Sequence, residues 1–160
     1  NTDLHLSSAW LYHEIGVSEM AVYHAELAYS RTKPDSAIIA RSDALEVLAL
    51  EAARNGDSQT AFSYARNAQK LVEDYGDSYF IAYNHIILIE LYLSLNMVSS
   101  AQPSFEYLKN IGDLFTESPS FLADKNEVLY QYSKATNNSE EALVYLELFL
   151  KMKKSMSEFD

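Results

Sequence analysis

The sequence contains no cysteine among its 160 residues, and it has only four glycines and three prolines. The lack of cysteine excludes a disulfide scaffold, and the small number of Gly and Pro residues excludes collagen-like and loop-rich chains. Because a cysteine-free chain suits oxidising and reducing compartments alike, the cellular compartment stays open.

Basic residues are also scarce, with 12 Lys and Arg against 23 Asp and Glu and a net charge of −11. Such a surface repels phosphate backbones and anionic lipid, so we expect no nucleic-acid partner. The sequence has no apolar run near the ~20 residues of a membrane span, and no signal peptide opens it. We therefore expect no membrane insertion. Because the chain begins at Asn1 without an initiator Met, we expect it to be part of a larger protein.

A repeat organises the residues that are present. Gly16, Gly56 and Asn96 follow one another at intervals of 40, and Asn137 follows after 41. Gly and Asn enter the left-handed backbone region most easily, so these positions predict turns between helices. Five residues after each turn an alanine begins a set spaced 0, +4, +7 on one helical face. The four sets are Ala21-Ala25-Ala28, Ala61-Ala65-Ala68, Ala101-Phe105-Leu108 and Ala142-Leu146-Phe149.

Another apolar helix is predicted before each turn, over residues 4–15, 37–53, 79–95 and 121–135. The sequence thus predicts an all-α fold of four helical hairpins, eight helices in all. We expect one domain with repeats at 2–35, 36–76, 77–118 and 119–160. Ser18, Asp57 and Ser139 are expected to cap second helices. Pro103 fits the first turn of a helix, while Pro34 and Pro119 are expected in the connections.

This frame resembles the tetratricopeptide repeat family. Repeat two fits it best, through Leu48, Ala49, Ala52, Gly56, Ala61, Ala65 and Ala68. The resemblance implies a right-handed superhelical stack that binds proteins or peptides on a concave face formed by the first helices. The period of 40–41 exceeds the usual 34 of the family and resembles divergent repeats of bacterial signalling proteins.

The end of the chain is similar to the last repeat before the signalling helix of bacterial sensor kinases and diguanylate cyclases. The similarity covers residues 142–156. It implies a sensory or interaction domain in the bacterial cytoplasm or periplasm, with a signalling domain further along the same chain.

The family frame places large apolar groups and carboxylates together on the expected concave face. This mixture suits a protein or peptide ligand that carries Lys or Arg. In the alternative interpretation, the carboxylates form a solvated face and the apolar residues pack between repeats. The expected face comprises Leu6, Trp10, His13, Glu14, Asp43, Glu46, Leu50, Tyr83, Ile86 and Glu90.

Signals for catalysis and metal binding are weak. The four histidines, His5, His13, His24 and His85, form no metal-ligand motif, although the first three could approach one another across the first hairpin. The sequence has no phosphate loop and no nucleophile elbow. We therefore expect no enzyme activity, no cofactor and no metal. The tyrosines at 12, 64, 92, 107 and 145 recur at similar frame positions, so we expect them to pack between helices.

The last helix is apolar on more than one face, although a terminal repeat should present a polar outer surface. Leu148, Met152 and Met156 are therefore candidate contacts for a second copy of the chain or for a helix from the rest of the protein. This leaves a second functional hypothesis, a structural scaffold or dimerisation module with no ligand in the groove.

Overall fold

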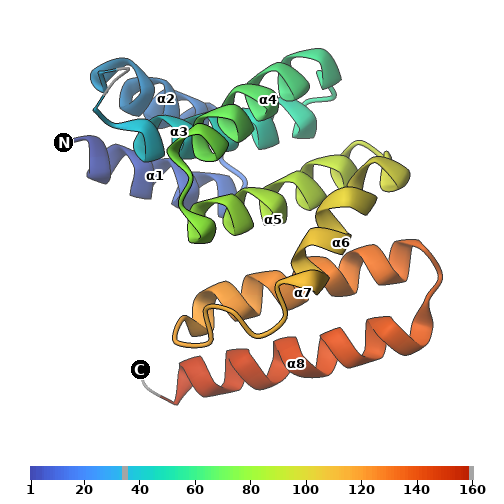
Figure 1. The fold of residues 1–160 in the computed structure, drawn as a ribbon. Helices are drawn as coiled ribbons and strands as arrows, with labels where there is room; N and C mark the ends of the chain where they lie inside the picture. Colours follow the sequence, from blue (N-terminus) through green and yellow to red (C-terminus); the bar gives the residue numbers. More distant parts are fainter. Residues whose placement is uncertain (34–35, 159–160) are drawn as a thin grey trace. The chain divides into compact units, whose positions relative to one another are not determined.

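The computed structural model describes residues 1–33 and 36–158, and its secondary structure is helical throughout that part of the chain (Figure 1). The all-α fold with eight α-helices is therefore confirmed for the described residues. The helices are α1 (Thr2–Glu14), α2 (Ser18–Arg31), α3 (Ile38–Arg54), α4 (Ser58–Tyr75), α5 (Ser78–Ser94), α6 (Gln102–Asn110), α7 (Pro119–Ala135) and α8 (Ser139–Ser157), with a short 3₁₀ helix, η1 (Val98–Ala101), before α6.

The chain divides into two compact units, Asn1–Ile87 and Leu88–Asp160, which we call the N-terminal and C-terminal units. The division falls inside α5, in the first helix of the expected third repeat. In the N-terminal unit α3 packs against α1, α2 and α4. In the C-terminal unit α7 packs along α8 and also contacts α6. No described helix has the combination of length and apolar character that crossing a membrane requires.

The turns between paired helices lie where the spacing predicts them. Gly16 and Gly56 have φ angles of +82° and +80°, and Asn96 and Asn137 have φ angles of +57° and +60°. This left-handed conformation costs little for Gly and is tolerated by Asn, so it reverses the chain directly after a helix. The forty-residue period therefore reflects a recurring backbone conformation.

The helix caps match the sequence prediction only in part. Asp57 caps α4 by accepting a hydrogen bond from the Thr60 amide at 3.1 Å, as predicted. Ser18 and Ser139 are instead the first residues of α2 and α8, so their assignment as caps is wrong by one position. Asn138 caps α8 because its side-chain oxygen accepts a hydrogen bond from the Glu141 amide at 3.2 Å.

The positions of the prolines also match the sequence prediction only in part. Pro103 lies in the first turn of α6, as predicted. Backbone N–H groups in the first turn have no acceptor within the helix, so the lack of an N–H in proline costs no helical hydrogen bond there. Pro119 opens α7 and so belongs to the helix, not to the connection. Pro34 lies outside the described residues. The connection from α6 to α7 spans residues 111–118 and contains Phe115 with a φ angle of +66°.

The alanine sets face the interior. Ala21, Ala25 and Ala28 are fully buried, and the second and third sets are at most 6% exposed. Their small side chains allow the second helices to approach the first helices closely. The fourth set is looser, since Ala142 is buried while Leu146 and Phe149 are half-buried.

Two of the predicted packing tyrosines lie at the main apolar cluster of the N-terminal unit. Tyr12 and Tyr64 pack against this cluster, which confirms the packing prediction for these two residues. Both rings are only half-buried, so each keeps an edge near solvent. The cluster contains Ala9, Ala21, Ala25, Leu45, Val47, Leu48 and Ala68.

Candidate ligand-binding groove

Two polar residues of the expected concave face bind each other. The Trp10 Nε1–H on α1 donates to Asp43 Oδ1 on α3 at 2.8 Å. Burial raises the pKa of Asp43, and the hydrogen bond from Trp10 opposes part of that rise. The structure thus brings both residues together, and their polar groups join α1 to α3.

His13 is engaged in a similar way, through a residue that the sequence analysis missed. Glu51 on α3 is fully buried, and its carboxylate lies 2.6 Å from His13 Nδ1 and 2.9 Å from Arg54 Nη1. The Ser18 hydroxyl donates to the other Glu51 oxygen. Arg54 Nη2 also donates to the His13 carbonyl oxygen at 3.1 Å.

These contacts connect the first hairpin to α3, and through them the Ser18 hydroxyl takes part in a tertiary contact. A signal for Glu51 exists in the sequence. It follows Ala44 and Leu48 on one buried helical face, where a carboxylate needs partners.

Burial removes four further residues from the expected binding surface. Leu6, Leu50 and Ile86 are 8%, 5% and 1% exposed, so they pack in the interior as the alternative interpretation proposes for apolar residues. Glu46 is also buried, which contradicts a solvated carboxylate at this position. Its carboxylate lies within hydrogen-bonding distance of the Ser42 hydroxyl at 3.2 Å and the Asn84 amide at 3.4 Å.

The remaining members of the expected face lie in different environments. Glu14 is exposed, and Tyr83 is half-buried. Glu90 is half-buried and belongs to the C-terminal unit, whereas the other nine members belong to the N-terminal unit. An open surface made of all ten residues therefore does not exist in the N-terminal unit.

Only two of the three N-terminal histidines meet. His5 Nδ1 lies 2.9 Å from His24 Nδ1, and Arg31 Nη1 lies 2.8 Å from His5 Nε2. Because Arg31 can only donate, His5 Nε2 accepts, and the proton of neutral His5 sits on Nδ1 facing His24. Desolvation and the Arg31 charge lower the pKa of His5. No group of three or more metal-ligating side chains occurs among the described residues.

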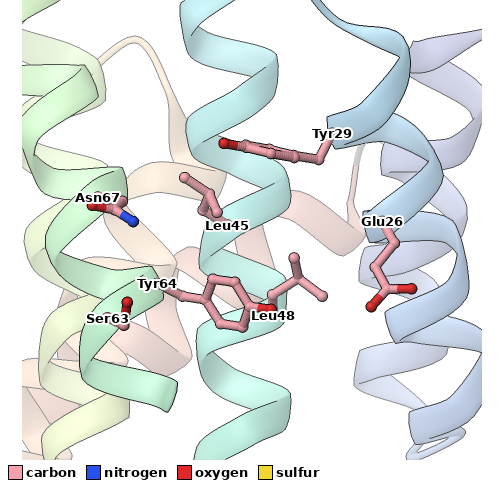
Figure 2. A pocket seen from close by; sticks show the side chains of 7 residues that line it. All are labelled: Glu26, Tyr29, Leu45, Leu48, Ser63, Tyr64 and Asn67. Atoms are coloured by element: carbon pink, nitrogen blue, oxygen red, sulfur yellow. The ribbon is translucent and has the colours of Figure 1, made fainter. Parts of the chain in front are cut away.

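The N-terminal unit also has a groove, which is a second candidate binding site apart from the expected concave face. It lies between α2 and α4, with α3 as its floor, and has a volume of about 230 Å³ (Figure 2). The Tyr29 ring from α2 and the Tyr64 ring from α4 both extend over α3, with Leu45 between the two rings and Leu48 beside Tyr64 (Figure 2). The lining residues are Glu26, Tyr29, Leu45, Leu48, Ser63, Tyr64 and Asn67.

Four of the polar side chains that line this groove have no polar partner among the residues that the structure describes. In the described part of the chain, Glu26, Ser63, Tyr64 and Asn67 make no side-chain hydrogen bond or ion pair with another residue. Glu26, Ser63 and Asn67 are exposed, so their polar atoms are accessible to a ligand. Ligand sites commonly combine an apolar surface with a few polar groups around it. The repeat frame did not indicate this groove, because it predicted Tyr64 only as a packing residue between helices and gave no role to Tyr29.

No family model matches this sequence, and no curated protein shows significant similarity to it. The assignment of the groove as a candidate site therefore relies on the arrangement of its lining side chains.

Proposed function

We propose that this chain is a non-catalytic module that binds a protein or peptide in the groove between α2 and α4. The observation that carries the proposal is the set of unpaired polar side chains around the Leu45 and Leu48 floor. A bound backbone can exchange hydrogen bonds with these groups while apolar side chains cover the leucines. The repeat frame supports a binding module, because the resemblance to tetratricopeptide repeats implies one. A sensory role in a bacterial signalling protein is part of the proposal and is supported by residues 142–156 alone.

Filling the groove tests this function. We expect that peptides of twelve residues selected from a random display library bind the protein with roughly micromolar to millimolar affinity. Ser63→Trp should weaken the binding of a selected peptide at least tenfold, because Ser63 is exposed at the groove wall and an indole there occupies the ligand volume. Isothermal titration calorimetry measures the change.

Ser7→Trp is the matched control, since Ser7 is an exposed serine on α1 outside the groove. It should leave peptide affinity unchanged. Equal affinity of the selected peptide for Ser63→Trp and the unaltered protein would exclude the groove as the binding site. Failure to select any peptide would contradict the peptide-binding function itself.

A second candidate function, a dimerisation or scaffold module, is favoured by α8. Leu143, Val144, Leu148 and Leu150 are between 41% and 56% exposed on this helix. Of the three candidate contact residues, Leu148 is exposed, while Met152 and Met156 are half-buried. Several exposed leucines on one helix favour association with another surface.

The expected result for this second function is a dimer in light scattering that Leu148→Asp converts to a monomer. Burying an unpaired carboxylate at the centre of an apolar interface costs more free energy than the apolar contacts of the dimer provide. Leu114→Asp serves as the control, because Leu114 is 54% exposed and lies in the C-terminal unit outside α8. A monomeric unaltered protein at high concentration would rule out self-association through α8.

A further inference from the structure

The groove contains a single charged side chain among its lining residues, the carboxylate of Glu26. It is exposed and has no ion-pair or hydrogen-bond partner in the described part of the chain. Its carboxylate is therefore accessible to a cation of a ligand, although water screens the attraction at an exposed site. The net charge of −11 reinforces this preference, because an acidic protein repels anionic ligands.

A cation of the protein itself already contacts one end of the groove. Arg41 lies one turn before Leu45 on α3, and its guanidinium carbon is 4.0 Å from the centre of the Tyr29 ring. Its Nη1 lies 3.0 Å from the Thr32 carbonyl oxygen, which helps hold the side chain in place. Tyr29 thus has a cation partner, and the positive charge of Arg41 disfavours a second cation beside it.

The other end of the groove has the opposite character. Glu26 and the Tyr64 hydroxyl lie on either side of Leu48 (Figure 2), and neither is paired within the described residues. A carboxylate and a phenol oxygen can both accept hydrogen bonds from an ammonium or a guanidinium group. Leu45 and Leu48 can cover the methylene groups that lead to such a cation, because long basic side chains bury their stems on apolar surface.

We propose that the groove takes a long aliphatic side chain that ends in a cation, Lys or Arg, from the bound peptide. This inference rests on the proposed function and specifies its ligand class. The methylene groups lie on Leu45 and Leu48, and the cation lies beside Glu26 and Tyr64. This position differs from the expected concave face, whose member Glu46 is buried and lies within hydrogen-bonding distance of Ser42.

Short peptides that differ at one position test the inference. Acetylated and amidated Ala-Ala-Xaa-Ala-Ala, with Xaa as Lys, Arg, norleucine or Glu, is titrated into labelled protein and followed by amide chemical shifts. We expect the Lys or Arg peptide to bind at least fivefold more tightly than the norleucine peptide, which has a similar apolar stem and no charge. The Glu peptide should bind most weakly. Comparing the Lys peptide with the Arg peptide shows whether the groove prefers an ammonium or a guanidinium group.

Glu26→Gln should remove the advantage of the cationic peptide, so that the Lys, Arg and norleucine peptides bind this variant with similar affinity. Glu19→Gln is the matched control, since it removes a carboxylate from an exposed site on the same helix outside the groove. If norleucine binds as tightly as Lys and Arg, or if Glu26→Gln keeps the fivefold difference, the inference is overturned. In those cases the peptide-binding function remains, because its own test depends on Ser63→Trp.

Discussion

Glu51→Ala is expected to lower the free energy of unfolding of the N-terminal unit by about 3 kcal/mol. The substitution leaves the His13 imidazole, the Ser18 hydroxyl and the Arg54 guanidinium without their shared acceptor. It also opens a cavity on the buried face of α3. This loss of stability is at the lower end of the range for breaking a buried ion pair. The side chains of His13 and Arg54 are 14% and 40% exposed, so water can hydrate them once the carboxylate is gone.

Urea unfolding followed by tryptophan fluorescence measures this loss. Trp10 is the single tryptophan of the chain and lies in the N-terminal unit, so its emission reports on that unit. Glu51→Gln keeps the side-chain volume and one acceptor oxygen and should cost about half as much. Glu14→Ala, at an exposed position of α1, should change stability by less than about 0.5 kcal/mol. A loss below about 1 kcal/mol in Glu51→Ala would show that water replaces the carboxylate.

Ala25→Leu is expected to cost about 2–3 kcal/mol, because it overfills the contact between the first hairpin and α3. Ala25 is fully buried in the same cluster as Ala9, Leu45 and Leu48, so three added carbon atoms have no free space. The helices must separate or the leucine must adopt an unfavourable rotamer. The midpoint of urea unfolding, again followed by Trp10 fluorescence, should move to lower urea concentration.

Ser7→Leu provides the comparison for this substitution. It adds apolar volume at an exposed position of α1, where nothing must move, and should stay within about 0.5 kcal/mol of the unaltered protein. If Ala25→Leu is as stable as Ser7→Leu, then the alanine sets are not required for close packing, and the explanation of the repeat by small residues is wrong.

The helices and turns of this chain could be predicted because their causes are local. An alanine five residues after each Gly or Asn turn lies on the buried face of the next helix, as Ala21, Ala61 and Ala101 show. The left-handed conformation of Asn96 and Asn137 depends only on their own side chains and their neighbours. The cap of α2 was less predictable, because the Ser18 hydroxyl binds a carboxylate thirty-three residues away.

The candidate site could not be predicted in the same way. The family frame placed Trp10 and Asp43 on adjacent helices correctly in space, yet it could not show that each satisfies the polar group of the other. Nor does helical periodicity distinguish an exposed glutamate such as Glu26 from a buried one such as Glu46. That difference depends on which helices pack around each residue.

The sequence by itself therefore determined the all-α class, the four turn positions and the buried alanine sets of this protein, because these features follow from backbone preference and spacing along one helix. Only the tertiary structure decided which side chains line the groove that we propose as the ligand site. The groove requires side chains from α2, α3 and α4 to meet, and this depends on how α2 and α4 each pack against α3. The same packing pairs Glu51 with His13 and Arg54, and so turns part of the expected binding face into an internal connection between α1 and α3.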